Sequence, residues 1–165
     1  MDTNKNILYY EELSSRRTER LFIALTVLFL LLDAWSVNAS GWNGLAVFFA
    51  VLSCFFLFYT INYRTLIIHS TAEWLKLTFG IFTWTVPFSN VEECSLDEVP
   101  ALMKNGGAGI HFMFIRKRYR ASFNFLEYPR VVIAFKNKVG PVQDISFSTR
   151  QPEEVLRMVW AAISL

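Results

Sequence analysis

A run of four basic residues near the middle of the chain is the clearest candidate for a binding site. It consists of Arg116, Lys117, Arg118 and Arg120 and falls at a predicted hairpin turn. Basic side chains near an anionic membrane surface each contribute about 1 kcal/mol of attraction, which added salt removes. We therefore predict that this basic turn binds anionic lipid headgroups or an acidic partner protein. The alternative is a solvated turn that discourages pairing between strand edges.

Histidines, glycines and carboxylates elsewhere lack the partners that catalysis or metal binding requires. His69 and His111 are the two histidines, and neither has partners at the spacing of a metal or catalytic site. The glycine-rich stretch 106–109 opens a strand pattern instead of the helix of a phosphate-binding loop, so we expect a turn. An acidic cluster without a calcium-loop glycine is expected to be a solvated face; it comprises Glu92, Glu93, Asp97 and Glu98. The sequence therefore predicts no metal, no cofactor and no enzymatic activity.

The composition excludes several classes of protein. Of the 165 residues, 53% are hydrophobic and 18% are charged, below the roughly 25% charged residues usual in soluble proteins. These values exclude a disordered chain. A net charge of +2 is too small for a protein whose affinity depends on nucleic-acid phosphates. Cys54 and Cys94 are forty residues apart, one of them in an apolar run, so we expect both to be reduced.

Two apolar segments near the N-terminus are candidates for membrane spans. Between Arg20 and Arg64 the only charged residue is Asp33, and a short polar break divides this stretch. We predict helices over 21–37 and 42–63, joined as an antiparallel hairpin because lipid offers no hydrogen-bond partners to open backbone. The first span would be about 25 Å long, slightly short for a hydrocarbon core of about 30 Å unless Arg20 extends to the interface.

Basic residues flank this hairpin on one side only. Lysine and arginine precede the first span and follow the second, whereas the connecting loop has none. The positive-inside rule then predicts a multi-pass protein of the inner cell membrane with both termini cytoplasmic. The residues predicted to anchor the interfaces are Arg16, Arg17, Arg20, Trp35, Trp42, Tyr63 and Arg64. An alternative takes the first span as a secretory signal cleaved after Ala39, but the acidic residues among the first twenty positions are unlike a signal peptide.

Asp33 is the one ionisable residue inside a predicted span. Such a residue is by default a candidate proton or ion site. Asp33 lies only a few residues from the outer loop, however, and the spans contain no lysine or arginine to pair with it. We expect an interfacial or structural role.

From Arg64 onward the pattern changes to short alternating stretches separated by turn residues. This pattern predicts a β domain over 64–165 with about seven, mostly antiparallel, strands. An amphipathic helix over about 152–164 ends the chain, with Pro152 at its first position. Charge is uneven along the domain, with a net −3 over 64–98 and +7 over 99–138. The segment 1–20 is expected to be a separate cytoplasmic segment.

The order of these signals resembles bacterial PH-domain membrane proteins, in which a helical hairpin precedes a pleckstrin-homology-type domain. The motifs that carry the resemblance are Leu66-x-Ile68, Leu75-x-Leu77-x-x-Gly80-x-Phe82, Val86-Pro87-x-x-x-Val91, Ile145-Ser146-Phe147-Ser148-Thr149 and Pro152-Glu153-Glu154-Val155. The resemblance implies an α+β fold: a transmembrane hairpin, then an antiparallel β-barrel or sandwich of PH-like type with a C-terminal helix. It also implies a membrane-tethered binding or scaffolding module. The long stretch 95–109 departs from the pattern.

These observations lead to one functional expectation and two alternatives. We expect a membrane protein whose cytoplasmic domain binds the bilayer, anionic lipid headgroups or a protein partner, with no role for nucleic acid. One alternative is a structural subunit of a larger membrane complex or a self-associating protein, packed through small residues at Gly41, Gly44, Ala46 and Ala50. The other is an enzyme that uses Asp33 or His111 as an acid or base.

Overall fold

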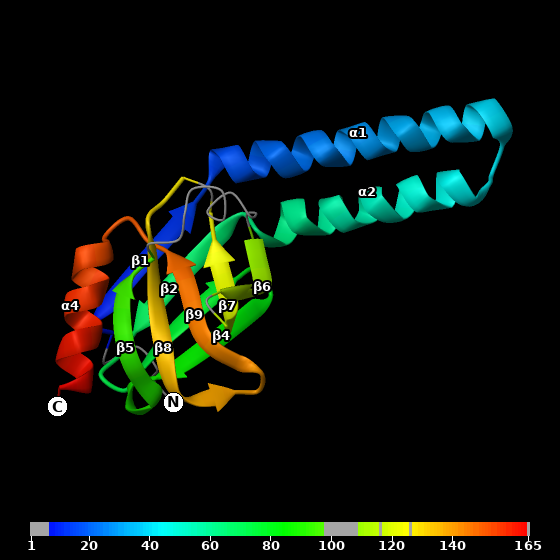
Figure 1. Ribbon diagram of the computed structural model, residues 1–165. Helices are drawn as coiled ribbons and strands as arrows, with labels where there is room; N and C mark the ends of the chain where they lie inside the picture. The colour runs from blue at the N-terminus through cyan, green and yellow to red at the C-terminus, as the bar shows by residue number, and fades with distance from the viewer. Residues whose placement is uncertain (1–6, 98–108, 116, 126, 165) are drawn as a thin grey trace, which may run out of the picture.

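The computed structural model has an α+β fold in which two long helices project from a two-sheet β domain (Figure 1). It describes residues 7–97, 109–115, 117–125 and 127–164. A third helix, α4, lies on the side of the β domain away from the two long helices (Figure 1).

The two projecting helices confirm the predicted apolar segments and extend the first of them. Helix α1 covers Arg16–Ser40 and α2 covers Gly44–Asn62. The Ser15 hydroxyl caps α1 by accepting the Thr18 N–H at 3.0 Å, and Asn43 caps α2 in the same way. With 25 residues α1 is about 37 Å long, and with 19 residues α2 is about 28 Å long. Both helices therefore have the length and composition to cross a membrane.

Aromatic rings and small polar residues pack the two helices against each other. Phe29 stacks on Phe56 with ring centroids 5.3 Å apart, and Phe22 meets Tyr59 edge-on at 5.3 Å. The buried hydroxyls of Thr26 and Ser53 donate to carbonyls one turn earlier in their own helices. These polar groups therefore need no partner outside the hairpin.

The first sheet contains four antiparallel strands in the order β1-β2-β3-β4. Its strands are β1 (Tyr9–Ser14), β2 (Thr65–Ser70), β3 (Trp74–Phe79) and β4 (Phe82–Pro87). Strand β1 pairs with β2 from Tyr9↔Ser70 to Ser14↔Thr65, although the sequence analysis assigned residues 1–20 to a separate segment. The β domain thus begins before the helices, and α1 and α2 are an insertion between two paired strands.

The second sheet contains five strands in the order β5-β8-β9-β7-β6. Its strands are β5 (Val91–Leu96), β6 (Gly109–Ile115), β7 (Arg118–Asn124), β8 (Arg130–Val139) and β9 (Val142–Ser148). The β8–β9 hairpin lies between β5 and β7, which makes β7 and β9 parallel neighbours. The expected number of about seven strands is therefore corrected, and of the two expected arrangements, barrel or sandwich, the described residues form no closed barrel. The described residues form nine strands in two sheets, and no pairing joins one sheet to the other.

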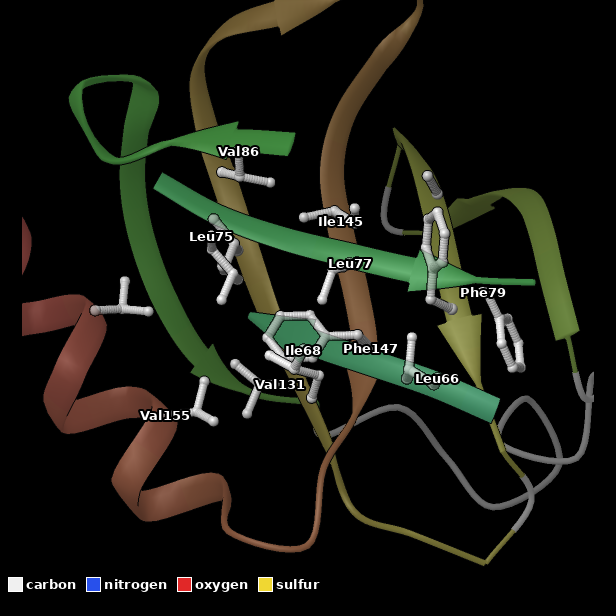
Figure 2. Close-up of a cluster of buried hydrophobic side chains, with 14 of the residues drawn as sticks. Leu66, Ile68, Leu75, Leu77, Phe79, Val86, Val131, Ile145, Phe147 and Val155 are labelled. Carbon is white, nitrogen blue, oxygen red and sulfur yellow. The ribbon is translucent and has the colours of Figure 1, made fainter. Parts of the chain in front are cut away.

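The core lies between the two sheets and extends to α4. Figure 2 shows Leu66, Leu77 and Phe79 of the first sheet facing Ile145 and Phe147 of the second. The last helix, α4 (Pro152–Ile163), adds Val155 and Val159, both fully buried. A short 3-10 helix, η1 (Phe88–Asn90), links the sheets and contacts α4. The predicted C-terminal helix is confirmed.

Candidate functional site

A cavity lies at the foot of the hairpin, where α1 and α2 join the first sheet. Its volume is about 460 Å³. It is lined by Ser14, Arg16, Glu19, Ile61, Asn62, Arg64, Thr65, Ile67, Thr78 and Gly80. Because β1 leads directly into α1 and α2 leads directly into β2, the pairing of these strands brings the two helix ends together here. Arg16 and Arg64, 48 positions apart in the sequence, thereby line one cavity.

The electrostatics of this cavity favour an anion. Arg64 is paired with Glu19 at 3.2 Å, but both side chains remain partly exposed. Arg16 is exposed in the first turn of α1, where the free N–H groups give the helix end a partial positive charge. Arg17, next to it, lies 3.7 Å from Glu127. Two guanidinium groups and one carboxylate leave the cavity lining with a net positive charge.

The other predicted interface residues fall into two groups. Arg20 is exposed near the same end of the hairpin, and Trp35 and Trp42 are 63% and 73% exposed near its far end. Tyr63 differs from the expectation, because its ring is 4% exposed. It packs on Phe79 at 4.9 Å and stacks with Phe82 at 6.2 Å. Tyr63 thus joins the end of α2 to the β domain.

Two of the four basic residues at the turn between β6 and β7, Arg118 and Arg120, form ion pairs with carboxylates. Arg120 is 8% exposed, and its two terminal nitrogens each lie 3.2 Å from a carboxylate, that of Asp97 and that of Asp144. Arg118 reaches the second oxygen of Asp144 at 2.6 Å and Glu92 at 3.6 Å. Lys117 is exposed at the turn with a φ of 68°, whereas Arg116 lies outside the described residues.

These ion pairs connect two charge clusters that the sequence analysis treated separately. Glu92 and Asp97, expected on a solvated acidic face, are counterions of Arg118 and Arg120. Glu93 is exposed, and Glu98 lies outside the described residues. The partners of each arginine are 23 to 26 positions away, on β5 and β9 or directly after β5, and the sequence did not predict how these strands are arranged. As folded, Arg120 is not available to a ligand.

The remaining candidate residues lie on separate elements of the fold. Asp33 lies within α1, half-buried, and His69 packs edge-on against Trp74 at 5.1 Å. His111 is half-buried on β6. The described residues contain no group of three potential metal ligands. Of the glycine-rich stretch 106–109, only Gly109 is among the described residues.

Two further residues are unsuited to the roles that their types suggest. Burial raises the pKa of the Cys94 thiol to about 12, with a smaller effect from the Glu93 charge, so this cysteine is a neutral core residue and not a nucleophile.

Ala46 is fully buried within the chain and cannot contact a second protein, whereas Gly41 and Gly44 are exposed.

Comparisons with known proteins add no relative. No protein-family model matches this chain, and no curated protein or solved structure matches it either. The function must therefore be inferred from the site itself.

Proposed function

We propose that this protein is a membrane-anchored binding module that crosses the inner membrane twice and holds the phosphate of an anionic lipid headgroup in the cavity at the foot of its hairpin. The observation that supports this proposal most directly is that Arg16 and Arg64 line the same cavity. The cavity lies at the adjacent ends of two helices that are long and apolar enough to cross a membrane. Neither catalysis nor a metal is part of this proposal.

The double crossing is supported by the position of the hairpin within the first sheet. Strand β1 precedes α1, strand β2 follows α2, and the two strands are paired along six residues each. Both strands must therefore lie on the same side of the bilayer, which requires an even number of crossings. The basic residues Arg16, Arg17, Arg20 and Arg64 are all at that end, which is cytoplasmic by the positive-inside rule. The same pairing opposes cleavage after Ala39, because cleavage would remove β1 from the sheet.

The chemistry of the cavity suits a lipid phosphate. Arginine presents several N–H groups in a plane and binds phosphate oxygens through paired, charge-assisted hydrogen bonds. The cavity also receives the positive end of α1, which favours an anion. Ile61 and Asn62, the last residues of α2, line the cavity and place it at the level where the apolar segment ends. In a bilayer this is the depth of the headgroups.

This proposal moves the expected lipid contact away from the basic turn. Arg118 and Arg120 already have carboxylate partners, so the turn offers Lys117 as its exposed cation among the described residues. The proposed kinship with PH-domain membrane proteins rests on the order of elements, a helical hairpin, β-strands and a C-terminal helix. The expected domain was mostly antiparallel, and the one parallel pair among the described strands is β7 with β9.

The test uses the full-length protein in neutral detergent with short-chain lipids added. A ligand that binds only the folded state stabilises it by about 2.7 kcal/mol at one hundred times its dissociation constant. We expect short-chain phosphatidylglycerol to raise the unfolding temperature and short-chain phosphatidylcholine to leave it nearly unchanged. The double variant Arg16→Gln, Arg64→Gln should lose the increase.

The matched control is Lys117→Gln with Lys138→Gln, which removes two exposed cations from other parts of the β domain. This control should keep the full response to phosphatidylglycerol. Equal stabilisation by both lipids, or a response that survives in the Arg16 and Arg64 variant, would exclude headgroup binding in the cavity.

A further inference from the structure

The β domain exposes large apolar side chains on the side that adjoins α2. The most exposed are Ile81 at 71% and Phe114 at 73%, followed by Phe112 at 52% and Phe82 at 40%. Ile81 lies in the β3–β4 turn and Phe82 is the first residue of β4, whereas Phe112 and Phe114 belong to β6. An exposed apolar surface of this kind marks a contact with another molecule or with lipid.

The β3–β4 turn is fixed against the last residues of α2. Phe82 stacks on Tyr63 at 6.2 Å and meets Phe58 edge-on at 6.3 Å. Gly80 lies so close to Asn62 that a Cβ at this position would overlap the Asn62 carbonyl. Ile81 follows Gly80 in the chain and is therefore held beside the C-terminal end of α2.

Strand β6 begins at the same point. A Cβ on Gly109 would lie 3.5 Å from the Tyr59 ring and 3.6 Å from the Tyr63 ring. Phe82 and Gly109 thus both adjoin Tyr63, which links the β3–β4 turn to β6. Figure 1 shows β6 as the strand of the second sheet nearest to the foot of α2.

The exposed rings of β6 lie on the edge strand of the second sheet, as far as the sheet is formed by the described residues. Strand β6 is the last strand of its sheet, and Phe112 and Phe114 both lie on its Tyr119 side, with ring centroids 6.2 Å and 4.9 Å from Tyr119. An apolar edge strand in water invites pairing with other chains. The described residues of β6 carry none of the usual safeguards, since the strand has no proline, lysine or acidic residue.

We propose that Ile81, Phe82, Phe112 and Phe114 form a lipid-contact face. Through this face the β domain contacts the interfacial region of the leaflet nearest to the C-terminal end of α2. This inference rests on the proposed crossing of the membrane by α1 and α2, and it adds a second membrane contact that is apolar and independent of headgroup charge. The bilayer is the occupant because the face continues the exposed apolar surface of α2, where the partly exposed ring of Phe58 meets that of Phe82 at 6.3 Å. Large apolar side chains such as phenylalanine enter the boundary between the headgroups and the acyl chains.

The test places an environment-sensitive fluorophore on the full-length protein in vesicles of neutral phosphatidylcholine with brominated acyl chains. Cys54 is exposed on α2 and Cys94 is buried, so Cys54→Ser gives a background for single labels. We expect a label at Phe114→Cys to lose fluorescence to the brominated lipid and to resist aqueous iodide. The matched control is Trp160→Cys on α4, an exposed aromatic position on the far side of the domain, which should respond only to iodide (Figure 1).

The outcomes separate this inference from the proposed function. A label at the native Cys54 reports directly whether α2 is in lipid, and neutral lipid makes the result independent of the headgroup cavity. Quenching at position 54 without quenching at 114 overturns the lipid-contact face while the crossing stands. No quenching at either position overturns both. A label at 114 shielded from brominated lipid and from iodide shows that another protein covers β6, which also overturns the inference. Ile81→Cys provides the same readings if Phe114→Cys does not fold.

Discussion

Arg120 shows how a residue that sequence assigns to binding can instead hold the fold together. Its guanidinium lies between Asp97 and Asp144, at 3.2 Å from each, and all three side chains are nearly buried. Replacing Arg120 with methionine would remove the counterion that the two carboxylates share, leaving Asp144 with Arg118 and Asp97 with the more distant charge of Arg130. Breaking a buried ion pair costs about 3–5 kcal/mol where the remaining charge has no other partner, so the loss here should be at the lower end, about 3 kcal/mol. We therefore expect Arg120→Met to lower the free energy of unfolding by that amount, measured by chemical denaturation in neutral detergent.

The neighbouring Lys117 provides the control for this prediction. Lys117 is exposed, so Lys117→Gln removes a charge of the same sign from the same turn without burying anything. The expected change in stability is within about 0.5 kcal/mol. If Arg120→Met were as mild as Lys117→Gln, the three charges would not form the buried cluster seen in the structure.

At the scale of elements, Gly80 connects the β3–β4 turn to the end of α2. Its φ of +60° belongs to the left-handed region, and an added Cβ would overlap the Asn62 backbone. Gly140, between β8 and β9, has nearly the same φ of +61° but has open space where a Cβ would be. Gly140→Ala should cost only the left-handed conformation, about 1–2 kcal/mol.

Gly80→Ala should cost clearly more than Gly140→Ala, because it adds a clash between the turn and the helix to the same backbone strain. Denaturation curves of the two variants in one detergent measure the difference directly. Equal losses would mean that the β domain and α2 are not packed as described, and the lipid-contact face would lose its fixed position.

Elements with a clear local pattern, the three helices and most of the strands after Arg64, were predicted from the sequence. The helices α1, α2 and α4 each have a continuous apolar run or stripe, and all three are present. Strand β1 was missed because Glu11 occupies a buried position between Tyr9 and Leu13, which hides the alternation. The Glu11 carboxylate is satisfied there by the Thr149 hydroxyl and the Arg150 N–H, at 2.6 Å and 2.8 Å.

Long-range pairing accounts for what sequence could not predict about the site. The arrangement of β7 beside β9 depends on contacts between residues about 24 positions apart, and no local pattern specifies it. The same holds for the cavity, because Arg16 and Arg64 meet only through the pairing of β1 with β2. The residue types at the membrane interface were predicted, but their convergence on one cavity was not.

At the scale of the whole molecule, the inserted hairpin ties membrane topology to the fold of the β domain. Strand β1 and α4 belong to one packed unit, so their residues must share one side of any bilayer that α1 and α2 cross. We expect cysteines at Tyr10→Cys and Arg157→Cys, both exposed positions, to react with an impermeant maleimide only after cells are opened. A cysteine at Trp42→Cys, in the loop between α1 and α2, should react in intact cells.

The three positions are compared in the Cys54→Ser background, where the remaining Cys94 is buried. Opposite sidedness of positions 10 and 157 would require β1 to leave the sheet, which would contradict the fold itself. Protection of all three positions in intact cells would contradict the crossing and leave the fold intact, since an apolar hairpin lying along the inner surface keeps the same β1–β2 pairing. The pattern of labelling thus distinguishes an error in the fold from an error in the membrane assignment, because only the first can separate the two ends of the chain.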